Sequence, residues 1–158
     1  MTALFRALGM LFRALTGLAF TVLIASVLLQ VFSRLLLPRS PVWTEELSRF
    51  ALLYMVAAGC GLAIRSGDLV NVDLVTNLLP GRWRSVLELL VLMVVIGFLG
   101  SLIMPAWKFV QIGAMQTSPA LGWSMNSIHF TVLLAPISLI LFALERCWTV
   151  IGTLGRGA

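Results

Sequence analysis

The chain has 158 residues, of which 60% are hydrophobic and 11% are charged, whereas soluble proteins average roughly 45–50% apolar and about 25% charged residues. A soluble protein of this length cannot hide so much apolar surface from water, so the composition excludes a water-soluble domain and predicts an all-α integral membrane protein. The basic residues behind the net charge of +5 stand singly or in pairs at the ends of apolar runs, which argues against nucleic-acid binding and favours contacts with membrane lipids.

The first apolar run predicts a membrane span over residues 14–36. Arg6 and Arg13 precede it, as basic residues precede the core of a signal peptide. However, the uncharged stretch from Ala14 to Ser33 is longer than the roughly 7–15 residues of such a core, and no small-residue cleavage site closes it. We therefore expect a retained helix that spans the bilayer.

The segment that follows carries the densest group of charges, Trp43-Thr44-Glu45-Glu46-Leu47-Ser48-Arg49. Trp43 belongs to an apolar helical stripe, from which the charged side chains project away. This pattern predicts an amphipathic helix in the membrane interface, which leads into a second span over residues 47–65. Glu45, Glu46 and Arg49 form either a solvated face or a cluster that holds the helix against a partner. Glu45 and Arg49, four residues apart, can also pair with each other.

Two further spans are predicted, over residues 86–107 and 128–146, with Pro136 inside the last and a loop over 111–127. The polar connection after span two contains Arg65 and Asp73, which are either interfacial anchors or partner contacts. Glycines in span two, such as Gly61, let a neighbouring helix approach closely. The chain is thus expected to form a single membrane domain of four helices.

No set of residues points to catalysis. His129 is the only histidine, and neither Cys60 nor Cys147 belongs to a cluster of potential metal ligands; we therefore expect no enzyme activity, no cofactor and no metal site. Glu88, one turn inside span three, has two interpretations. It marks an ion pathway, or it pairs with Arg84 four residues earlier.

The distribution of Lys and Arg predicts the orientation, because cytoplasmic loops carry an excess of these residues. With both termini inside, seven basic residues are cytoplasmic: Arg6, Arg13, Arg65, Arg82, Arg84, Arg146 and Arg156. Four lie on the other side: Arg34, Arg39, Arg49 and Lys108. Both termini are therefore expected in the cytoplasm.

The sequence resembles the small membrane subunit (DctQ family) of tripartite ATP-independent periplasmic (TRAP) transporters over nearly its whole length. The resemblance rests on the four-span plan and on three motifs: Trp43 to Arg49, the run from Gly59 through Arg65 and Gly67 to Val72-Asp73, and Ser118-Pro119-Ala120-Leu121-Gly122 followed by Pro136. Many family members carry a histidine four residues before the Val-Asp aspartate. Leu69 stands there in this chain, so no role of that histidine is carried over.

The resemblance implies a subunit of a bacterial inner-membrane importer of organic acids (carboxylates), coupled to sodium. A periplasmic substrate-binding protein would deliver the substrate to a large permease subunit, which would hold the substrate and sodium sites, while the small subunit would act as a scaffold. The candidates for subunit-interface or structural roles are Trp43, Glu45, Glu46, Arg49, Arg65, Asp73 and Pro136.

The alternative is a small self-assembling, proton-coupled multidrug or ion transporter that uses Glu88. A solute carrier normally has internal repeats, broken helices and a polar site at mid-membrane, and the sequence shows none of these features. Transport by the chain alone would favour this alternative over the accessory-subunit interpretation.

Overall fold

The computed structural model describes residues 2–36, 41–66 and 81–154, and these residues form an all-α membrane protein, as predicted. The helices are α1 (Thr2–Leu36), α2 (Trp43–Ser66), α4 (Gly81–Gly113) and α5 (Asn126–Leu154). All four are long and apolar enough to cross a membrane. Each helix extends beyond the span expected from the sequence. The largest extension is in α1, which begins at Thr2 instead of residue 14.

The segment from Trp43 to Arg49 is the beginning of α2 rather than a separate interfacial helix. Residues 43–58 contain neither proline nor glycine, so the helix continues once it has been nucleated. The hydroxyl of Thr44 donates a hydrogen bond of 2.7 Å to the carbonyl of Pro41 just before the helix. The amphipathic turns predicted from the sequence therefore open the second span directly.

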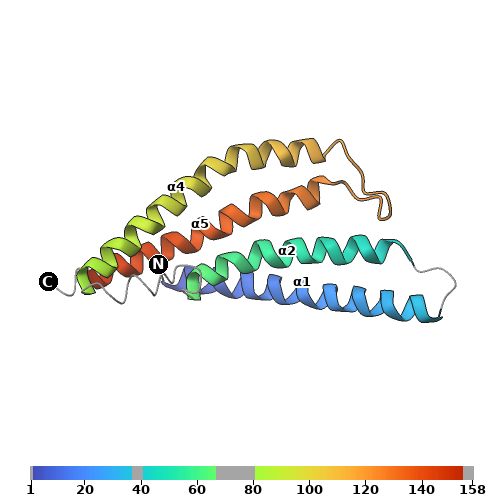
Figure 1. The fold of residues 1–158 in the computed structure, drawn as a ribbon, viewed down its shortest axis with the longest axis horizontal. Coiled ribbons are helices and arrows are strands. Elements are labelled where there is room, and N and C mark those ends of the chain that lie inside the picture. Colours follow the sequence, from blue (N-terminus) through green and yellow to red (C-terminus); the bar gives the residue numbers. More distant parts are fainter. Residues whose placement is uncertain (1, 37–40, 67–80, 155–158) are drawn as a thin grey trace.

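The four helices lie in a row in the order α1, α2, α5, α4 (Figure 1). The beginning of α1 and the end of α5 lie at the same end of the helices, here named the terminal end. The opposite end, named the distal end, carries the connection between α4 and α5. Extensive packing joins only neighbours in the row, α1 to α2, α2 to α5 and α5 to α4. The row thus has two edge helices, α1 and α4, whose most apolar stretches are only 11% buried.

Helices α2 and α5 approach each other closely at Gly61. A Cβ atom at this position would lie 2.8 Å from Cδ2 of Phe142 and 2.9 Å from Cβ of Ser138. The Ser138 hydroxyl is completely buried and donates a hydrogen bond of 2.7 Å to the carbonyl of Ala57 on α2. Small residues and polar side chains are the usual means by which membrane helices associate. The close approach expected from the glycines of span two is therefore found at Gly61.

A leucine at Gly61 is expected to separate α2 from α5. Overpacking a filled contact costs about 1–3 kcal/mol, and here two neighbouring side chains and the Ser138 backbone occupy the space. We expect Gly61→Leu to lower the free energy of unfolding in mixed micelles by at least about 2 kcal/mol. Gly97→Leu is the matched control, because a Cβ at Gly97 on α4 meets nothing within 4 Å. Equal stabilities of the two variants would contradict this account of the contact.

Candidate functional site

The carboxylate of Glu46 joins the beginning of α2 to the connection between α4 and α5. It accepts a hydrogen bond from the hydroxyl of Ser118, and bonds from the backbone N–H groups of Ala120 at 3.2 Å and Leu121 at 3.1 Å. Consecutive N–H groups that converge on one anion form a favourable electrostatic cradle. We name this arrangement the Glu46 clasp. It brings together two of the segments that carry the family resemblance.

The connection between α4 and α5 is shaped to present these donors. The N–H of Ser118 donates to the carbonyl of Trp123 at 2.8 Å, and Thr117 and Ser124 form an isolated β-bridge. Gly122 closes the turn with a φ of 67°, a conformation that glycine adopts at little cost. The loop predicted over residues 111–127 is therefore an ordered hairpin-like turn, shorter than expected because α4 continues to Gly113.

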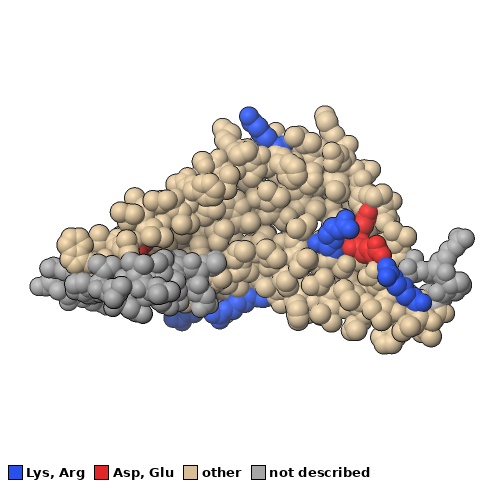
Figure 2. All heavy atoms as spheres, viewed as in Figure 1, with Lys and Arg blue, Asp and Glu red and all other residues tan. Residues whose placement is uncertain are grey.

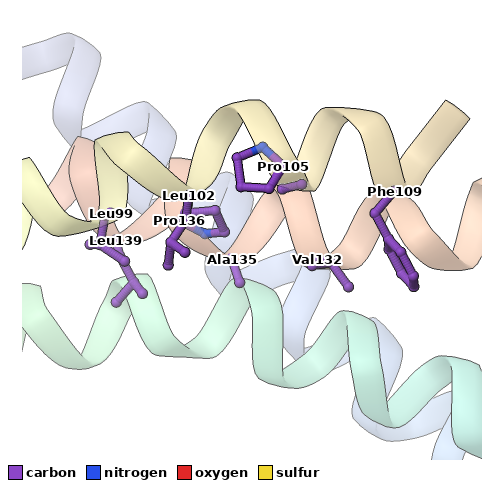
Figure 3. Close-up of a pocket in the computed structure, with 9 residues that line it drawn as sticks. Leu99, Leu102, Pro105, Phe109, Val132, Ala135, Pro136 and Leu139 are labelled. Carbon is purple, nitrogen blue, oxygen red and sulfur yellow. The ribbon is translucent and has the colours of Figure 1, made fainter.

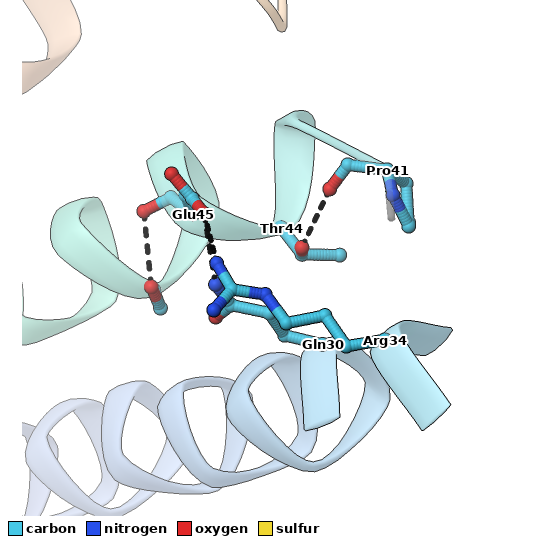
Figure 4. Close-up of polar contacts among 6 residues, drawn as sticks. Gln30, Arg34, Pro41, Thr44 and Glu45 are labelled. Atoms are coloured by element: carbon cyan, nitrogen blue, oxygen red, sulfur yellow. Dashed lines mark hydrogen bonds and ion pairs between the residues drawn. The ribbon is translucent and has the colours of Figure 1, made fainter. Parts of the chain in front are cut away.

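Glu45, the neighbour of Glu46, ties α2 to α1 instead. Its Oε1 atom accepts hydrogen bonds from Arg34 at 2.8 Å and from Gln30 at 3.0 Å (Figure 4). Glu45 thus pairs with Arg34 rather than with Arg49, the partner that its helical spacing makes possible, because the antiparallel α1 presents a guanidinium to the same carboxylate. Both members of the Arg34–Glu45 ion pair are largely exposed, so the pair adds little to stability.

Trp43 and Arg49 are both exposed at the distal end. Figure 2 shows basic and acidic side chains gathered at this end, over the beginning of α2 and the end of α1. Both glutamates are engaged within the chain, whereas Arg49 and Trp43 keep exposed side chains.

At the terminal end, two adjacent residues of α5 connect it to two other helices. Glu145 forms an ion pair of 3.2 Å with Arg65 of α2, and Arg146 forms one of 2.6 Å with Glu88 of α4. The expected pairing of Glu88 with Arg84 on its own helix is wrong. Glu88 points toward α5, and its side chain is only 18% exposed. A pair with Arg146 of α5 is therefore better shielded from water than a pair with Arg84 on the same helix would be.

Arg65 also contacts two apolar surfaces. Its guanidinium lies 5.7 Å from the centre of the Phe142 ring, a cation–π arrangement. On its other side it lies against Gly9 of α1, where a Cβ would clash with it. Arg65 therefore contacts α1 and α5 from its place on α2. Asp73, which the sequence grouped with Arg65, lies outside the described residues.

His129 and Pro136 lie along the contact between α4 and α5. The Nδ1 atom of His129 is 3.1 Å from the carbonyl of Phe109, and the two rings stack with centres 4.0 Å apart. Pro136 is buried and faces an apolar groove that Pro105 of α4 also lines (Figure 3). His129 thus has a structural partner, and Pro136 contributes to a surface that contains no reactive group.

Within the described part of the chain, no group of three or more histidine, cysteine or acidic residues could hold a metal ion. The charged groups instead connect the helices to one another. The Glu46 clasp does so at the distal end, and the Arg65–Glu145 and Glu88–Arg146 pairs do so at the terminal end. Sequence reasoning missed the partners Arg34, Glu145 and Arg146. Ser118 belongs to the motif Ser118 to Gly122, but nothing in the sequence spacing connects it with Glu46, 72 residues away.

Comparisons with known proteins agree with this picture. The profile of the family described as "Tripartite ATP-independent periplasmic transporters, DctQ component" matches residues 23–153. The chain is 27% identical over 128 residues to the sialic acid TRAP transporter small permease protein SiaQ of Vibrio cholerae, covering 81% of this chain and 74% of the relative. It is also 30% identical over 71 residues to the sialic acid TRAP transporter permease protein SiaT of Haemophilus influenzae, covering 45% of this chain but 12% of that relative.

The Glu46 clasp can be tested by hydrogen exchange. Glu46→Gln removes the negative charge of the acceptor. Because a charged acceptor forms stronger hydrogen bonds with N–H donors than a neutral one does, the amides of Ala120 and Leu121 should exchange faster in this variant. Glu45→Gln is the matched control, because it loosens the contact with α1 but leaves the hairpin-like turn untouched. Mass spectrometry of a peptide covering residues 114–125 measures the rate. Identical exchange in the wild type and both variants would show that the clasp does not hold the turn.

Proposed function

The chain belongs to the DctQ family, the small membrane component of tripartite ATP-independent periplasmic transporters, and we propose that it is a scaffold beside the large permease subunit rather than the transport pathway itself. It is a multi-pass protein of the bacterial inner membrane. Transporters of this family combine a small and a large membrane subunit with a periplasmic binding protein. What remains to be proposed is the role of this chain within that assembly.

The main support for the scaffold proposal is that the charged residues lie toward the ends of the helices and not in their middles. Charged residues are absent from residues 14–33, 50–64, 89–107 and 128–144, which form the middles of the four helices. Six of the charged residues toward the helix ends form three ion pairs within the chain. A transporter for a charged solute needs polar groups near mid-membrane. Such groups are expected in the large subunit instead.

The open arrangement of the helices supports the same role. Because α1 and α4 each pack mainly against a single helix, both expose many large apolar side chains. A surface of this kind suits contact with a second membrane protein as well as with lipid. The similarity to part of a longer permease protein fits a chain that works next to a permease.

For the substrate, we propose an organic acid, imported together with sodium. The two relatives described above are named for transport of sialic acid, which is itself an acid. The alternative, proton-coupled transport through Glu88, has less support, because Glu88 pairs with Arg146 at the terminal end of the row rather than near its middle.

Reconstitution separates these possibilities. In liposomes with an inward sodium gradient, the chain alone should take up no organic acid above the background of empty liposomes. Uptake should require the large subunit and the binding protein, because the helix middles of this chain offer no polar group to a carboxylate. Sialic acid is a suitable first probe. Sodium- or proton-driven uptake by the chain alone would overturn the scaffold proposal.

Both termini are proposed to lie in the cytoplasm, since seven of the 11 basic residues then lie on that side. A phosphatase that is active only in the periplasm, fused after Ala158, should therefore show background activity. The same enzyme inserted in the turn at Gln116 should be strongly active, because this turn lies at the distal end of the row. The reverse pattern of activities would show that the orientation is inverted.

Arg49 is proposed to contact the large subunit. Truncating a charge that is desolvated at an interface weakens binding substantially, so Arg49→Ala should reduce co-purification of the large subunit roughly tenfold or more while the chain still inserts normally. Glu46→Ala is expected to weaken co-purification as well, through loss of the clasp. Arg39→Ala, in the segment before α2, should have much less effect. Wild-type yields of complex from both Arg49→Ala and Glu46→Ala would mean that these turns only face solvent.

A further inference from the structure

The first three turns of α1, residues 2–13, extend beyond its membrane span. Charged residues are absent from residues 14–33, and this stretch, at about 1.5 Å per residue, matches the hydrocarbon core of about 30 Å. The whole helix has 35 residues and is therefore about 52 Å long, whereas a bilayer with its head groups is about 40–45 Å thick. The first three turns thus lie at the level of the lipid head groups or just outside it.

Two arginines in these turns have no acidic partner. Arg6 and Arg13 are exposed, and neither belongs to an ion pair among the described residues. The sequence of α1 contains no acidic residue, and Glu145, at the same end of the molecule, is already paired with Arg65. Figure 2 shows basic side chains along the α1 edge of this half, with no acidic side chain beside them in that view. This part of α1 therefore carries positive charge that the described chain does not neutralise.

The two arginines share one face of a helix that is held in place. A separation of seven residues is close to two full turns, so Arg6 and Arg13 lie on the same face, about 10 Å apart along the axis. A different face of these turns packs against the other helices. Phe12 is buried and meets the ring of Phe142 on α5 edge to face, with ring centres 5.5 Å apart. The arginines are therefore fixed to the packed part of the molecule.

Exposed apolar side chains on the same turns favour a position in the membrane surface rather than in water. Leu4, Met10 and Leu11 are each more than half exposed. A tilt of about 30° would keep a helix of about 52 Å within a bilayer of about 45 Å, and membrane helices tilt by about 0–40°. Tilting therefore places both arginines at the level of the head groups while it keeps these apolar side chains out of water.

From the unpaired arginines and their level in the membrane, we propose that the first three turns of α1 bind an anionic phospholipid through Arg6 and Arg13. A guanidinium group can donate two parallel N–H bonds to phosphate oxygens. Each basic residue near an anionic surface strengthens binding about fivefold, the equivalent of about 1 kcal/mol. The binding is independent of the scaffold role. Only its assignment to the cytoplasmic leaflet rests on the proposed orientation.

The alternative occupant is an acidic surface of the large subunit. It would need carboxylates that match two guanidiniums about 10 Å apart, and burying such pairs in an interface costs desolvation that can exceed the attraction gained. Lipid phosphates already lie at this level of the membrane. They also move laterally, so they can match the spacing of the two arginines without a second designed surface. An anionic lipid therefore fits these turns better than a protein surface does.

The proposal is tested on the purified full chain, stripped of lipid in detergent. Phosphatidylglycerol and phosphatidylcholine with identical acyl chains are titrated separately, and native mass spectrometry gives the affinity for the first lipid bound. The wild type should bind phosphatidylglycerol more tightly. Arg6→Gln and Arg13→Gln should each weaken phosphatidylglycerol binding about fivefold, and the double variant about twentyfold or more, with phosphatidylcholine unchanged. Lys108→Gln is the matched control and should bind like the wild type, because it removes one exposed charge from α4 at the distal end.

Two results of the titration would overturn the proposal. Equal affinities of the wild type for the two lipids would show that the negative head group is not recognised. Equal losses in Lys108→Gln and in the arginine variants would show that binding does not depend on this site. Co-purification with the large subunit tests the alternative occupant. If the double variant releases the large subunit while the isolated chain keeps wild-type affinity for phosphatidylglycerol, an acidic surface of the permease meets the arginines and the proposal is wrong.

Discussion

The close approach of α2 and α5 at Gly61 is the contact on which the rest of the structure depends. The edge helix α1 packs mainly against α2, and α4 packs mainly against α5, so the packing of α2 on α5, centred on Gly61, is the main contact between the two halves of the row. Gly61 lets the backbones approach, and the buried Ser138 hydroxyl bonds across to Ala57. Since lipid is as apolar as the helices, packing and interhelical hydrogen bonds rather than the hydrophobic effect must hold them together.

A row of helices has consequences that a closed bundle lacks. Each edge helix leaves most of its apolar surface uncovered, which water would not tolerate but a bilayer accepts. The charged contacts at the two ends then limit how far the helices can slide, because the Glu46 clasp, the Arg34–Glu45 pair and the ties of α5 at Glu145 and Arg146 each join different elements. The middle of the row stays free for contact with lipid and with another membrane protein.

The number and class of the helices could be predicted because the length of an apolar run and its flanking charges are local properties. Partners of individual charges could not. Glu88 has Arg84 at a helical spacing of four, yet it bonds to Arg146, 58 residues away; Glu45 likewise bonds to Arg34 rather than to Arg49. Local spacing shows only that a pair is possible. The facing helix decides which guanidinium lies beside the carboxylate where water is partly excluded. The interfacial helix predicted over Trp43 to Arg49 is instead the beginning of α2, because a change in polarity does not by itself end a helix.

The position of Glu88 also bears on which protein carries the solute. A carboxylate that couples transport to an ion must release and regain its charge partner during each cycle, and it must lie where the solute passes. Glu88 instead lies one helix turn beyond Arg84 near the terminal end, held by Arg146 at 2.6 Å, and the pair helps to join α4 to α5. Neutralising Glu88 would leave the Arg146 guanidinium half-buried without a partner, so a cycle of protonation would act against the packing of α4 on α5. Glu88, which helps to hold α4 against α5, is therefore poorly suited to couple transport to an ion. The groups that do so are better sought in the large subunit.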